Sequence, residues 1–537
     1  MKRIAAAAAA TLLLATGVSA AETQRYLVAT KHPFRAGGAP AREARNVDGF
    51  GAAFDGYAAD LTSDEVAALE ADAGVRWVEP VIERHAFAQP ARNPAAQTVP
   101  YGVTLVHAPQ VWTATHSKTI NVVVIDTGVD YRHPELAKIY AGGYNFVGGN
   151  ADPLDDAGHG THVAGTIAAS NDSAGVVGVA PDVRLWALKV LNASGSGSSE
   201  STIKAVDWVI ARKTELGGNW VVNLSLGADR ASNAEREAFK RTVAAGVLVV
   251  AASGNDSTAT AVAPVSYPAA YDGVLAVGAI DDTLALASFS NQGPQLDVVA
   301  PGVDVLSTLP LGTGSLAWID DASNRYMGAG LEGAKRGSVT APYVYCGLGK
   351  TADFPAGVAG KIALIRRGEL QFAEKTRNAM AAGAIAVAIF NNDSSAINFT
   401  LWPTDDPTAK TTDWPVTVGI AKADGEALAA RNSGTITVAN VADDYGFYSG
   451  TSMASPHAAG AAALLWSTAP NATASDIAAA LRDTATDLGA SGFDNAFGAG
   501  VVNVLAATQR LAPGAFTTVP PPPPTTPTTG RRILKRG

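Results

Sequence analysis

The stretch Ile120-Asn-Val-Val-Val-Ile-Asp126-Thr-Gly128 decides the fold class of this chain. A run that is apolar at almost every position is typical of a parallel strand buried on both faces of a sheet. Three similar runs begin at Trp220, Val247 and Val274. Helical patterns lie between the runs, over 201–216 and 233–245. This alternation predicts an α/β fold, in which a parallel sheet carries helices on both faces.

The composition is that of a large globular chain. Of the 537 residues, 47% are apolar and only 17% are charged, which excludes a disordered polyelectrolyte. The net charge is −9 and the body of the chain has no basic run, so we expect no nucleic-acid partner. The single cysteine, Cys346, excludes an internal disulfide framework and a cysteine-based zinc cluster.

The two ends of the chain have distinct compositions. Lys2 and Arg3 precede an uncharged stretch, 4–21, which is mostly Ala and Leu and ends in small residues. This layout predicts a signal peptide over 1–21, and therefore a secreted, extracellular protein with no membrane span once the signal is removed. A membrane anchor is the alternative, because such a stretch is nearly long enough to span a bilayer. At the far end, 513–537 is a Pro/Thr-rich linker with a basic tail.

Changes of pattern divide the rest of the chain. Residues 22–95 contain two strand patterns and a helix opened by the capping-box sequence Thr62-Ser-Asp-Glu65. The parallel-strand pattern fills 96–310 and returns over 443–512. Between them, 311–442 have a strand-helix-strand pattern of their own. We therefore expect one α/β domain, formed by the two outer segments, and a second domain inserted into it.

Three motifs carry residues suited to nucleophilic catalysis. Asp126 directly follows an apolar strand, where open α/β sheets build their sites. His159 lies in Gly158-His-Gly-Thr-His162, and Ser452 lies in Ser449-Gly-Thr-Ser at the start of an Ala-rich helix, whose free N–H groups suit a developing oxyanion. Each motif alone is compatible with a structural role. Together they predict an acyl-transfer site, because serine needs a base and the base needs an orienting acid.

The chain order Asp, His, Ser resembles that of the subtilases, the subtilisin-like serine proteases. The resemblance is carried by four stretches: Ala96-Gln-Thr-Val-Pro-Tyr-Gly-Val103, Val124-Ile-Asp-Thr-Gly-Val-Asp130, His159-Gly-Thr-His-Val-Ala-Gly165 and Gly450-Thr-Ser-Met-Ala-Ser-Pro-His457. It implies that Asp126 orients, that His159 is the general base and then acid, and that Ser452 is the nucleophile of an endopeptidase with an acyl-enzyme intermediate.

The same resemblance implies an oxyanion hole and a substrate cleft. Asn255, in Ser253-Gly-Asn255, matches the family's oxyanion-hole asparagine, with the N–H of Ser452 as second donor. The substrate-binding residues that it implies are Ser225, Leu226, Gly227, Gly195, Gly197 and Ser266. The glycines are expected to leave room for an extended peptide, and Ser266 to form the floor of a pocket that prefers bulky apolar or aromatic side chains.

A structural calcium site is also implied by the resemblance. Its ligands are the side chains of Gln97, Glu135 and Asp172 and the carbonyls of Ser170, Ala174 and Val176. Glu135 departs from the aspartate that is commoner in the family. A bound ion suits a secreted fold without disulfides, because binding only to the native state adds stability. A polar surface loop is the alternative interpretation of 170–176.

The flanking segments resemble two further modules. Residues 22–95 resemble an inhibitory propeptide, which implies an intramolecular inhibitor that is removed by self-cleavage near 94–96. Residues 311–442 resemble a protease-associated domain, best over Gly360-Lys-Ile-Ala-Leu-Ile-Arg-Arg-Gly368. The whole pattern predicts a secreted, monomeric endopeptidase that acts on proteins or peptides. A ligase or cyclase that passes the acyl group to an amine, and an inert binding protein, are the alternatives.

Overall fold

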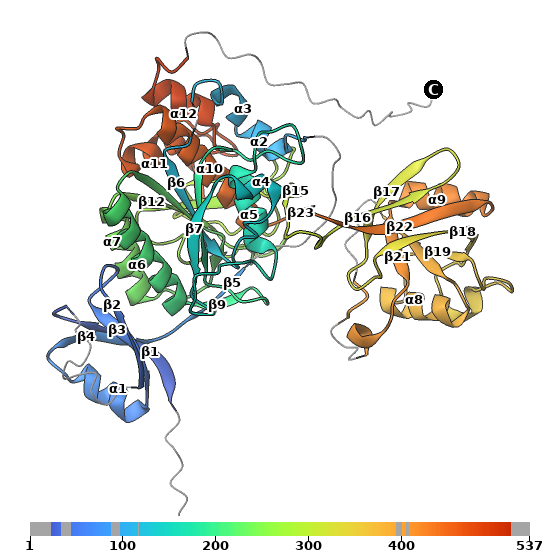
Figure 1. Cartoon of the computed structure of the whole chain (residues 1–537), viewed down its shortest axis with the longest axis horizontal. Helices are drawn as coiled ribbons and strands as arrows, with labels where there is room; N and C mark the ends of the chain where they lie inside the picture. The colour runs from blue at the N-terminus through green and yellow to red at the C-terminus, as the bar shows by residue number, and fades with distance from the viewer. Residues whose placement is uncertain are drawn as a thin grey trace, which may run out of the picture. The chain divides into compact units, whose positions relative to one another are not determined.

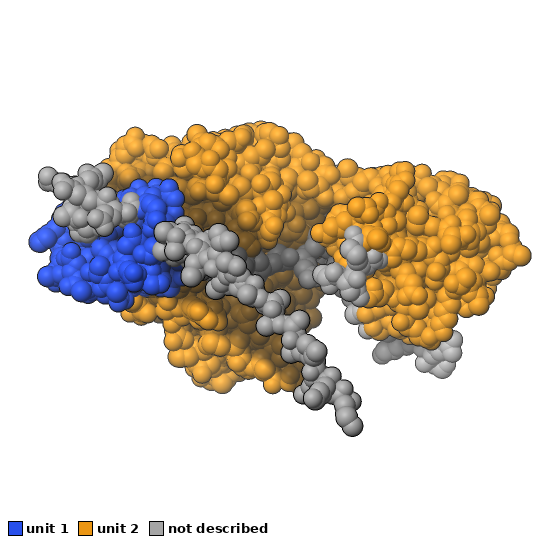
Figure 2. All heavy atoms as spheres, turned by 90° about the horizontal axis from the view of Figure 1, so that it is seen from below, with its two compact units in different colours: residues 1–51, 55–81 blue, residues 52–54, 82–537 orange. Residues whose placement is uncertain are grey.

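The computed structural model describes residues 23–33, 45–86, 97–115, 117–393, 400–403 and 408–516. The chain divides into two compact units (Figure 2). The first comprises residues 1–51 and 55–81, and the second comprises residues 52–54 and 82–537. The predicted signal segment, 1–21, lies outside the described residues, as do 517–537 of the predicted tail. No described helix is long and apolar enough to cross a membrane.

The first unit is a four-stranded antiparallel sheet with one helix. Its strands, in spatial order, are β2 (Arg45–Phe50), β3 (Gly56–Leu61), β1 (Gln24–Thr30) and β4 (Val75–Pro80). The helix α1 (Ser63–Glu70) begins with the predicted capping box, in which Thr62 and Glu65 each accept the other's backbone N–H. Leu69 of this helix packs with Val28 and Tyr57 of the sheet, so the unit has a small core of its own.

The second unit is built on a seven-stranded parallel sheet (Figure 1). Its strands, in spatial order, are β14 (Val298–Pro301), β13 (Val274–Ile280), β12 (Val247–Ala252), β10 (Asn219–Leu224), β6 (Ile120–Asp126), β8 (Arg184–Lys189) and β7 (Tyr140–Asn145). The apolar runs noted in the sequence form β6, β10, β12 and β13. The predicted parallel strands are therefore confirmed, and these four are almost wholly buried.

Helices cover this sheet on both faces, as predicted. The helices α5 (His159–Ala168) and α10 (Thr451–Thr468) pack against each other and against the face that carries Val122, Val124 and Val250. The helices α6 (Ser199–Leu216) and α7 (Asn233–Ala244) also pack together, and Figure 1 shows them on the other side of the sheet. Outside the barrel, the other described α-helices of this unit are α2 (Tyr101–Leu105), α3 (Ala108–Val111), α4 (Pro134–Ala137), α11 (Ala474–Asp483) and α12 (Val504–Leu511).

A closed barrel interrupts this unit between β14 and α10. Its strands, in order around the barrel, are β16 (Gly314–Asp320), β17 (Arg325–Gly330), β21 (Val416–Ile420), β20 (Ala386–Phe390), β19 (Ile362–Arg366), β18 (Gly337–Tyr345) and β22 (Thr435–Asp443). The helices α8 (Phe372–Ala381) and α9 (Lys422–Arg431) accompany them. The strand-helix-strand pattern of 361–390 is thus confirmed as β19, α8 and β20.

Two short sheets complete the second unit. The chain enters the barrel through β15 (Val305–Thr308) and leaves it through β23 (Tyr445–Tyr448), and these two strands pair antiparallel. A three-stranded sheet places β5 (Glu83–Ala86) between β9 (Ser196–Ser198) and β11 (Leu226–Gly227). The backbone of 83–86 therefore lies as an extended segment between the two edges that the sequence assigns to substrate.

Candidate active site

Asp126 and His159 are held together at the carboxyl end of the central strand. Asp126 is the last residue of β6 and His159 is the first residue of α5. Asp126 Oδ1 lies 2.6 Å from His159 Nδ1 and 2.7 Å from the backbone nitrogen of Thr127. Both side chains are buried. A carboxylate in this position holds a proton on Nδ1 and leaves Nε2 as the basic nitrogen.

A glycine allows the helix that carries His159 to approach Asp126 so closely. At Gly160, a Cβ atom would lie 2.0 Å from the carbonyl oxygen of Gly128 and 3.1 Å from the Cβ of Asp126. A side chain at this position would therefore push α5 away from the end of β6. Glycine at 160 thus has a packing reason, which bears directly on the distance between Asp126 and His159.

Ser452 lies in the first turn of α10 and is locked to the end of β10. Its Oγ donates to the carbonyl of Ser225 at 3.0 Å, and Ser225 Oγ donates to the carbonyl of Ser452 at 2.7 Å. Pro456 explains the second contact, because a proline has no N–H for the carbonyl four residues before it. The carbonyl of Ser452 is left without a helical donor, and Ser225 supplies one.

Asn255 is held beside Ser452, the predicted nucleophile, by Thr451, the residue directly before that serine. Asn255 Oδ1 accepts from the backbone N–H of Thr451 at 2.9 Å and from Thr451 Oγ1 at 2.7 Å. Because Thr451 engages the carbonyl oxygen, the Nδ2 donors of the side chain are not needed for this contact. The structure thus brings Asn255 to the helix N-terminus that carries Ser452. Thr451 was missed by the sequence reasoning, although its place directly before the predicted nucleophile was a usable signal.

The predicted substrate residues lie in or next to the strands β9 and β11, except Ser266, which lies beside the turn Ser253-Gly254-Asn255. Leu226 and Gly227 form β11, and Gly197 is in β9. Gly195 lies in the turn before β9. Glycine at 197 has a packing reason as well, because a Cβ there would lie 2.3 Å from the carbonyl oxygen of Val190, within the protein itself. Ser266 is buried and its Oγ accepts from Asn291 Nδ2 at 3.2 Å.

Three separate segments meet at the predicted calcium site. Gln97 Nε2 donates to the carbonyl of Ser170 at 2.8 Å, and its Oε1 accepts from the N–H of Ser173 at 3.0 Å. Glu135 is buried, and burial raises its pKa to about 7 despite the hydrogen bond that Tyr445 donates to Oε1 at 2.9 Å. Asp172 lies nearer the surface, with Lys138 Nζ at 2.9 Å from Oδ2.

The geometry of these residues fits a cation. Glu135 Oε2 is buried and has no hydrogen-bond partner among the described residues, so it lacks the positive or donor group that a buried carboxylate oxygen needs. The other predicted ligands supply oxygen atoms of the kind that calcium prefers: a second carboxylate, an amide oxygen and backbone carbonyls. Of these, Gln97 Oε1 and the Ser170 carbonyl here accept hydrogen bonds from within the chain. No group of three or more His, Cys, Asp or Glu side chains forms a metal cluster in the described part of the chain. A site of two carboxylates, one amide and backbone carbonyls does not require one.

Comparison with known proteins agrees with this architecture. The subtilase family model matches residues 117–333, and the PA domain model matches residues 339–428. Subtilisin E of Bacillus subtilis (strain 168) is 40% identical over 258 residues, which are 48% of this chain and 64% of that protein. Subtilisin DY of Bacillus licheniformis is 44% identical over 219 residues, which are 41% of this chain and 77% of that protein.

A solved structure agrees with the sequence relatives. The crystal structure of the psychrophilic subtilisin-like protease Apa1 from the Antarctic psychrotroph Pseudoalteromonas sp. AS-11 matches with a TM-score of 0.56 and 31% identity. The match covers 79% of this chain and 100% of that one. A carboxylate-oriented histidine and a serine at a helix N-terminus, on a doubly covered parallel sheet, agree with the subtilisin-like class of serine proteases that these matches indicate. The chain belongs to the subtilase family and carries an inserted PA domain.

Proposed function

We propose that this chain is a secreted serine endopeptidase that hydrolyses peptide bonds in proteins or peptides, and that it acts as a monomer. The observation that carries the proposal is the 2.6 Å contact between Asp126 and His159 at the end of the sheet that also positions Ser452. In the proposed reaction Ser452 Oγ attacks the carbonyl carbon of the scissile bond. His159 Nε2 takes the hydroxyl proton and then gives it to the departing amine nitrogen, which leaves an acyl ester on Ser452. A water molecule repeats the sequence and releases the acid.

Two donors are proposed to stabilise the oxyanion of this reaction. They are the Nδ2 group of Asn255 and the backbone N–H of Ser452, which lies in the first turn of α10 and has no helical acceptor to bind. The hydrogen bonds from Thr451 to Asn255 Oδ1 support this role, because they orient the amide before any substrate arrives. Donors that are already in place cost little reorganisation at the moment of reaction.

The cleft is proposed to bind substrate as an added strand. The pairing of β5 supports this, because its backbone joins both edges at once: His85 pairs with Gly227 of β11 and with Ser196 of β9. Backbone pairing of this kind supplies affinity with little dependence on sequence. We propose that bulky apolar or aromatic residues are preferred before the scissile bond, with Ser266 at the floor of the pocket. Cleavage of a peptide library mainly after Arg or Lys would contradict that preference.

Labelling of the nucleophile tests the proposed activity. A serine-directed phosphonyl or sulfonyl reagent is expected to modify Ser452 and to abolish hydrolysis, as located by peptide mapping. Ser452→Ala should lose the label and lower kcat by several orders of magnitude. Ser449→Ala is the matched control, because that serine lies three residues away and contacts Asp304. An unlabelled Ser452 in a folded protein would refute the proposal, and a product mixture dominated by transfer to amines would favour a ligase.

We further propose that 22–95 is an inhibitory propeptide that the enzyme removes from itself. Two features support it: β5 fills the position of a substrate strand, and the backbone N–H groups of Ala52 and Ala53, which belong to the second unit, donate to the carboxylate of Asp207 on α6. The predicted cut near 94–96 lies outside the described residues. Ser452→Ala is expected to keep the intact precursor mass, and removal of the precursor segment by that purified variant would contradict self-cleavage.

Calcium is proposed as a structural ion. Gln97, Glu135 and Asp172 would hold it together with the carbonyls of Ser170, Ala174 and Val176, and it would supply the charge that the buried Glu135 Oε2 lacks. Secretion is proposed from the signal pattern of 1–21, and 311–442 are proposed to shield or extend the substrate cleft.

A further inference from the structure

Lys189 is a buried cation that the proposed mechanism does not use. It is the last residue of β8 and pairs in register with Asp126, the last residue of β6. The residue is only 3% exposed, although burying an ammonium group is costly unless its donors are satisfied. A methionine would fill the same volume without that cost, so the charge needs a reason.

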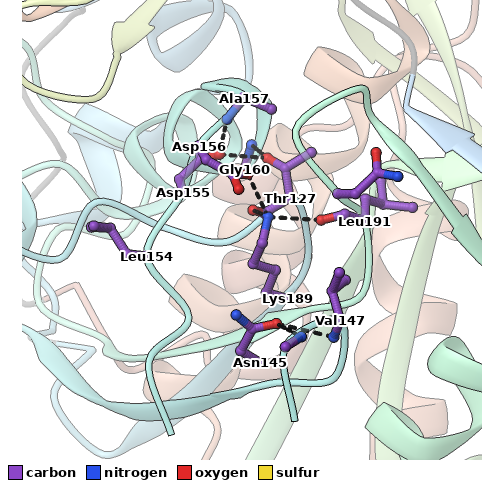
Figure 3. A network of polar contacts seen from close by, with 12 residues as sticks. Thr127, Asn145, Val147, Leu154, Asp155, Asp156, Ala157, Gly160, Lys189 and Leu191 are labelled. Carbon is purple, nitrogen blue, oxygen red and sulfur yellow. Dashed lines mark hydrogen bonds and ion pairs between the residues drawn. The ribbon is translucent and has the colours of Figure 1, made fainter. Parts of the chain in front are cut away.

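The three donors of the ammonium group each have an acceptor. Lys189 Nζ lies 2.6 Å from the carbonyl oxygen of Thr127, 2.8 Å from that of Leu191 and 2.6 Å from Asp156 Oδ1 (Figure 3). An ammonium group has three N–H donors and no acceptor, so these contacts use its full capacity. Only one of the partners is a carboxylate, and Asp156 is itself largely exposed. The ion pair with Asp156 is therefore not the main reason for a charged residue at position 189.

Each acceptor belongs to a different part of the active site. Thr127 directly follows Asp126, and its backbone N–H donates to the catalytic carboxylate. Asp156 lies in the turn that leads into His159 at the start of α5. Leu191 forms a bridge with Gly197 on the substrate edge, and its N–H donates to the carbonyl of Asp126. One ammonium group thus joins the acid, the approach to the base and the edge that binds substrate.

The hydroxyl of Thr127 makes further hydrogen bonds that fix the position of this residue. Thr127 Oγ1 donates to Asp155 Oδ1 at 2.8 Å and accepts from the N–H of Gly160 at 2.9 Å (Figure 3). Asp155 Oδ2 in turn accepts from the N–H and the hydroxyl of Thr161 at 2.9 and 2.6 Å. The loop after Asp126 and the first turn of α5 are therefore joined through Asp155, and the same loop is bound by Lys189.

We propose that Lys189 is a positioning residue, which holds the loop of Asp126, the turn before His159 and the substrate edge at Leu191 in one fixed arrangement. The inference rests on the proposed peptidase activity. Without the ammonium group, the carbonyls of Thr127 and Leu191 lose a buried donor and the loop can relax. A displacement of about 1 Å in a catalytic constellation lowers turnover by up to about 100-fold.

The test compares two buried lysines in the same chain. Lys189→Met is expected to lower kcat for a short peptide about 10- to 100-fold per active site, with the number of sites counted by the serine-directed reagent. Lys375→Met is the matched control, because Lys375 is also buried and its ammonium group also has three acceptors. These are the backbone carbonyls of Leu348, Arg366 and Gly368, in the barrel. This control should lower stability and leave kcat per labelled site unchanged.

Counting active sites separates positioning from folding. A merely structural role of Lys189 would reduce the number of labelled sites and leave kcat per site within about twofold of the parent, and that result would overturn the inference. A parent enzyme that neither hydrolyses peptides nor takes the label would instead refute the proposed function, so the two failures are distinguishable.

A second variant keeps the test informative if Lys189→Met does not fold. Thr127→Val removes only the hydroxyl that joins Asp155 to Gly160, and we expect a loss in kcat per labelled site of about tenfold. Asp156→Ala removes the exposed acceptor of Lys189 and is also expected to lower kcat per labelled site. When it is combined with Thr127→Val, the two losses should be non-additive, because both residues act on the same loop. Additive losses, or a Thr127→Val enzyme with parental kcat, would overturn the inference.

Discussion

The open sheet and the closed barrel of the second unit are built from similar apolar strands, yet they use their strand ends differently. In the sheet, β6 lies between β10 and β8. The chain goes from β6 to the edge strand β7, returns through β8, and then continues on the other side of β6 through β10, β12, β13 and β14, so the direction of strand addition reverses beside β6. Strand ends at such a switch point border a crevice in which side chains can meet a ligand. Three polar residues lie at the carboxyl ends of these strands: Asp126 ends β6, Lys189 ends β8, and Ser225 directly follows β10.

The barrel also contains parallel strands, from β18 to β21, but the groups at their ends bind one another. Lys375 binds the carbonyls of Arg366 and Gly368, at and just after the end of β19. Asn391, directly after β20, accepts from Arg367 and donates its backbone N–H to the carbonyl of Ile420. The comparison teaches that burial of a polar group at the end of a strand does not by itself indicate a reactive site: in the barrel such groups satisfy one another, whereas in the sheet they gather where the strand order reverses.

The largest expected effect distinguishes the asparagines that follow β12 and β20. Asn255→Leu should lower kcat for a short peptide about 100- to 1,000-fold, because one oxyanion donor is lost; this is the magnitude known for removal of such a donor from a subtilisin. Asn391→Leu should leave kcat per labelled site unchanged and lower the melting temperature of the barrel. Steady-state kinetics on both variants is the measurement. Equal loss of kcat in the two would break the distinction between the regions.

Acid should affect the sheet before it affects the barrel. Burial, together with the neighbouring His159, lowers the pKa of His162 to about 3. The unfolded chain takes up this proton near pH 6.5, so folding stability is present above that pH and falls as the pH drops towards 3, by up to about 1.4 kcal/mol per pH unit. Residues 311–442 contain no histidine. Calorimetry between pH 7 and 5 should therefore shift the unfolding of the sheet and leave that of the barrel nearly in place.

His162→Gln isolates the contribution of this histidine. Its Nε2 lies 2.9 Å from the carbonyl oxygen of Val305 and 3.2 Å from that of Gly446, so it joins the strand that enters the barrel to the strand that leaves it. The variant is expected to be less stable at pH 7 but to have a flatter pH dependence, by up to one proton. An unchanged slope would mean that His162 does not contribute to the acid response.

Calcium should stabilise the sheet and leave the barrel unaffected. At a free concentration of 100 times its Kd, an ion that binds only the folded state adds about 2.7 kcal/mol to the free energy of unfolding. Chelation should remove this stabilisation and lower the melting temperature of the sheet. Glu135→Gln should abolish the difference, whereas Asp393→Asn, which changes an exposed carboxylate of the barrel, should preserve it. A parent protein whose melting is the same with and without chelator would contradict the ion.

The smallest effect is expected from removing the barrel. The start of its first strand, β16, lies next to the end of its last strand, β22, since Gly314 pairs with Asp443. Replacing 315–442 by a short Gly/Ser linker should leave the sheet folded, because β15 and β23 still pair with each other. Hydrolysis of a short peptide should change little, and cleavage of folded proteins should change more if the barrel shields the cleft. Loss of the label on Ser452 would mean that the sheet needs the barrel to fold.

Much of the site was predictable from sequence because its parts are local. The apolar run before Asp126, the glycines around His159 and the helix that starts beside Ser452 each need only a few neighbouring residues to identify them. The helix boundaries were close for the same reason, since capping at Thr62, Ser198 and Ser232 acts within one turn.

Other features had no such local signal. The reciprocal bonds between Ser225 and Ser452 join residues 227 positions apart, and their cause, Pro456, is visible only when both elements are in place. The Lys189 contacts and the backbone collision that explains Gly197 likewise follow from which strands are neighbours.

By itself the sequence determined where strands and helices form, which residues are chemically able to react, and that one domain is inserted into another. The apolar patterns of buried strands and the capping residues of helices each involve only a few neighbouring residues, so they can be recognised in the sequence. Only the tertiary structure decided which groups meet at the end of the sheet, that 83–86 lie between the two substrate edges, and that one buried lysine lies at the active site while another lies in the barrel. The physical reason is that a hydrogen bond between distant residues depends on strand order and register, which no single stretch of chain contains.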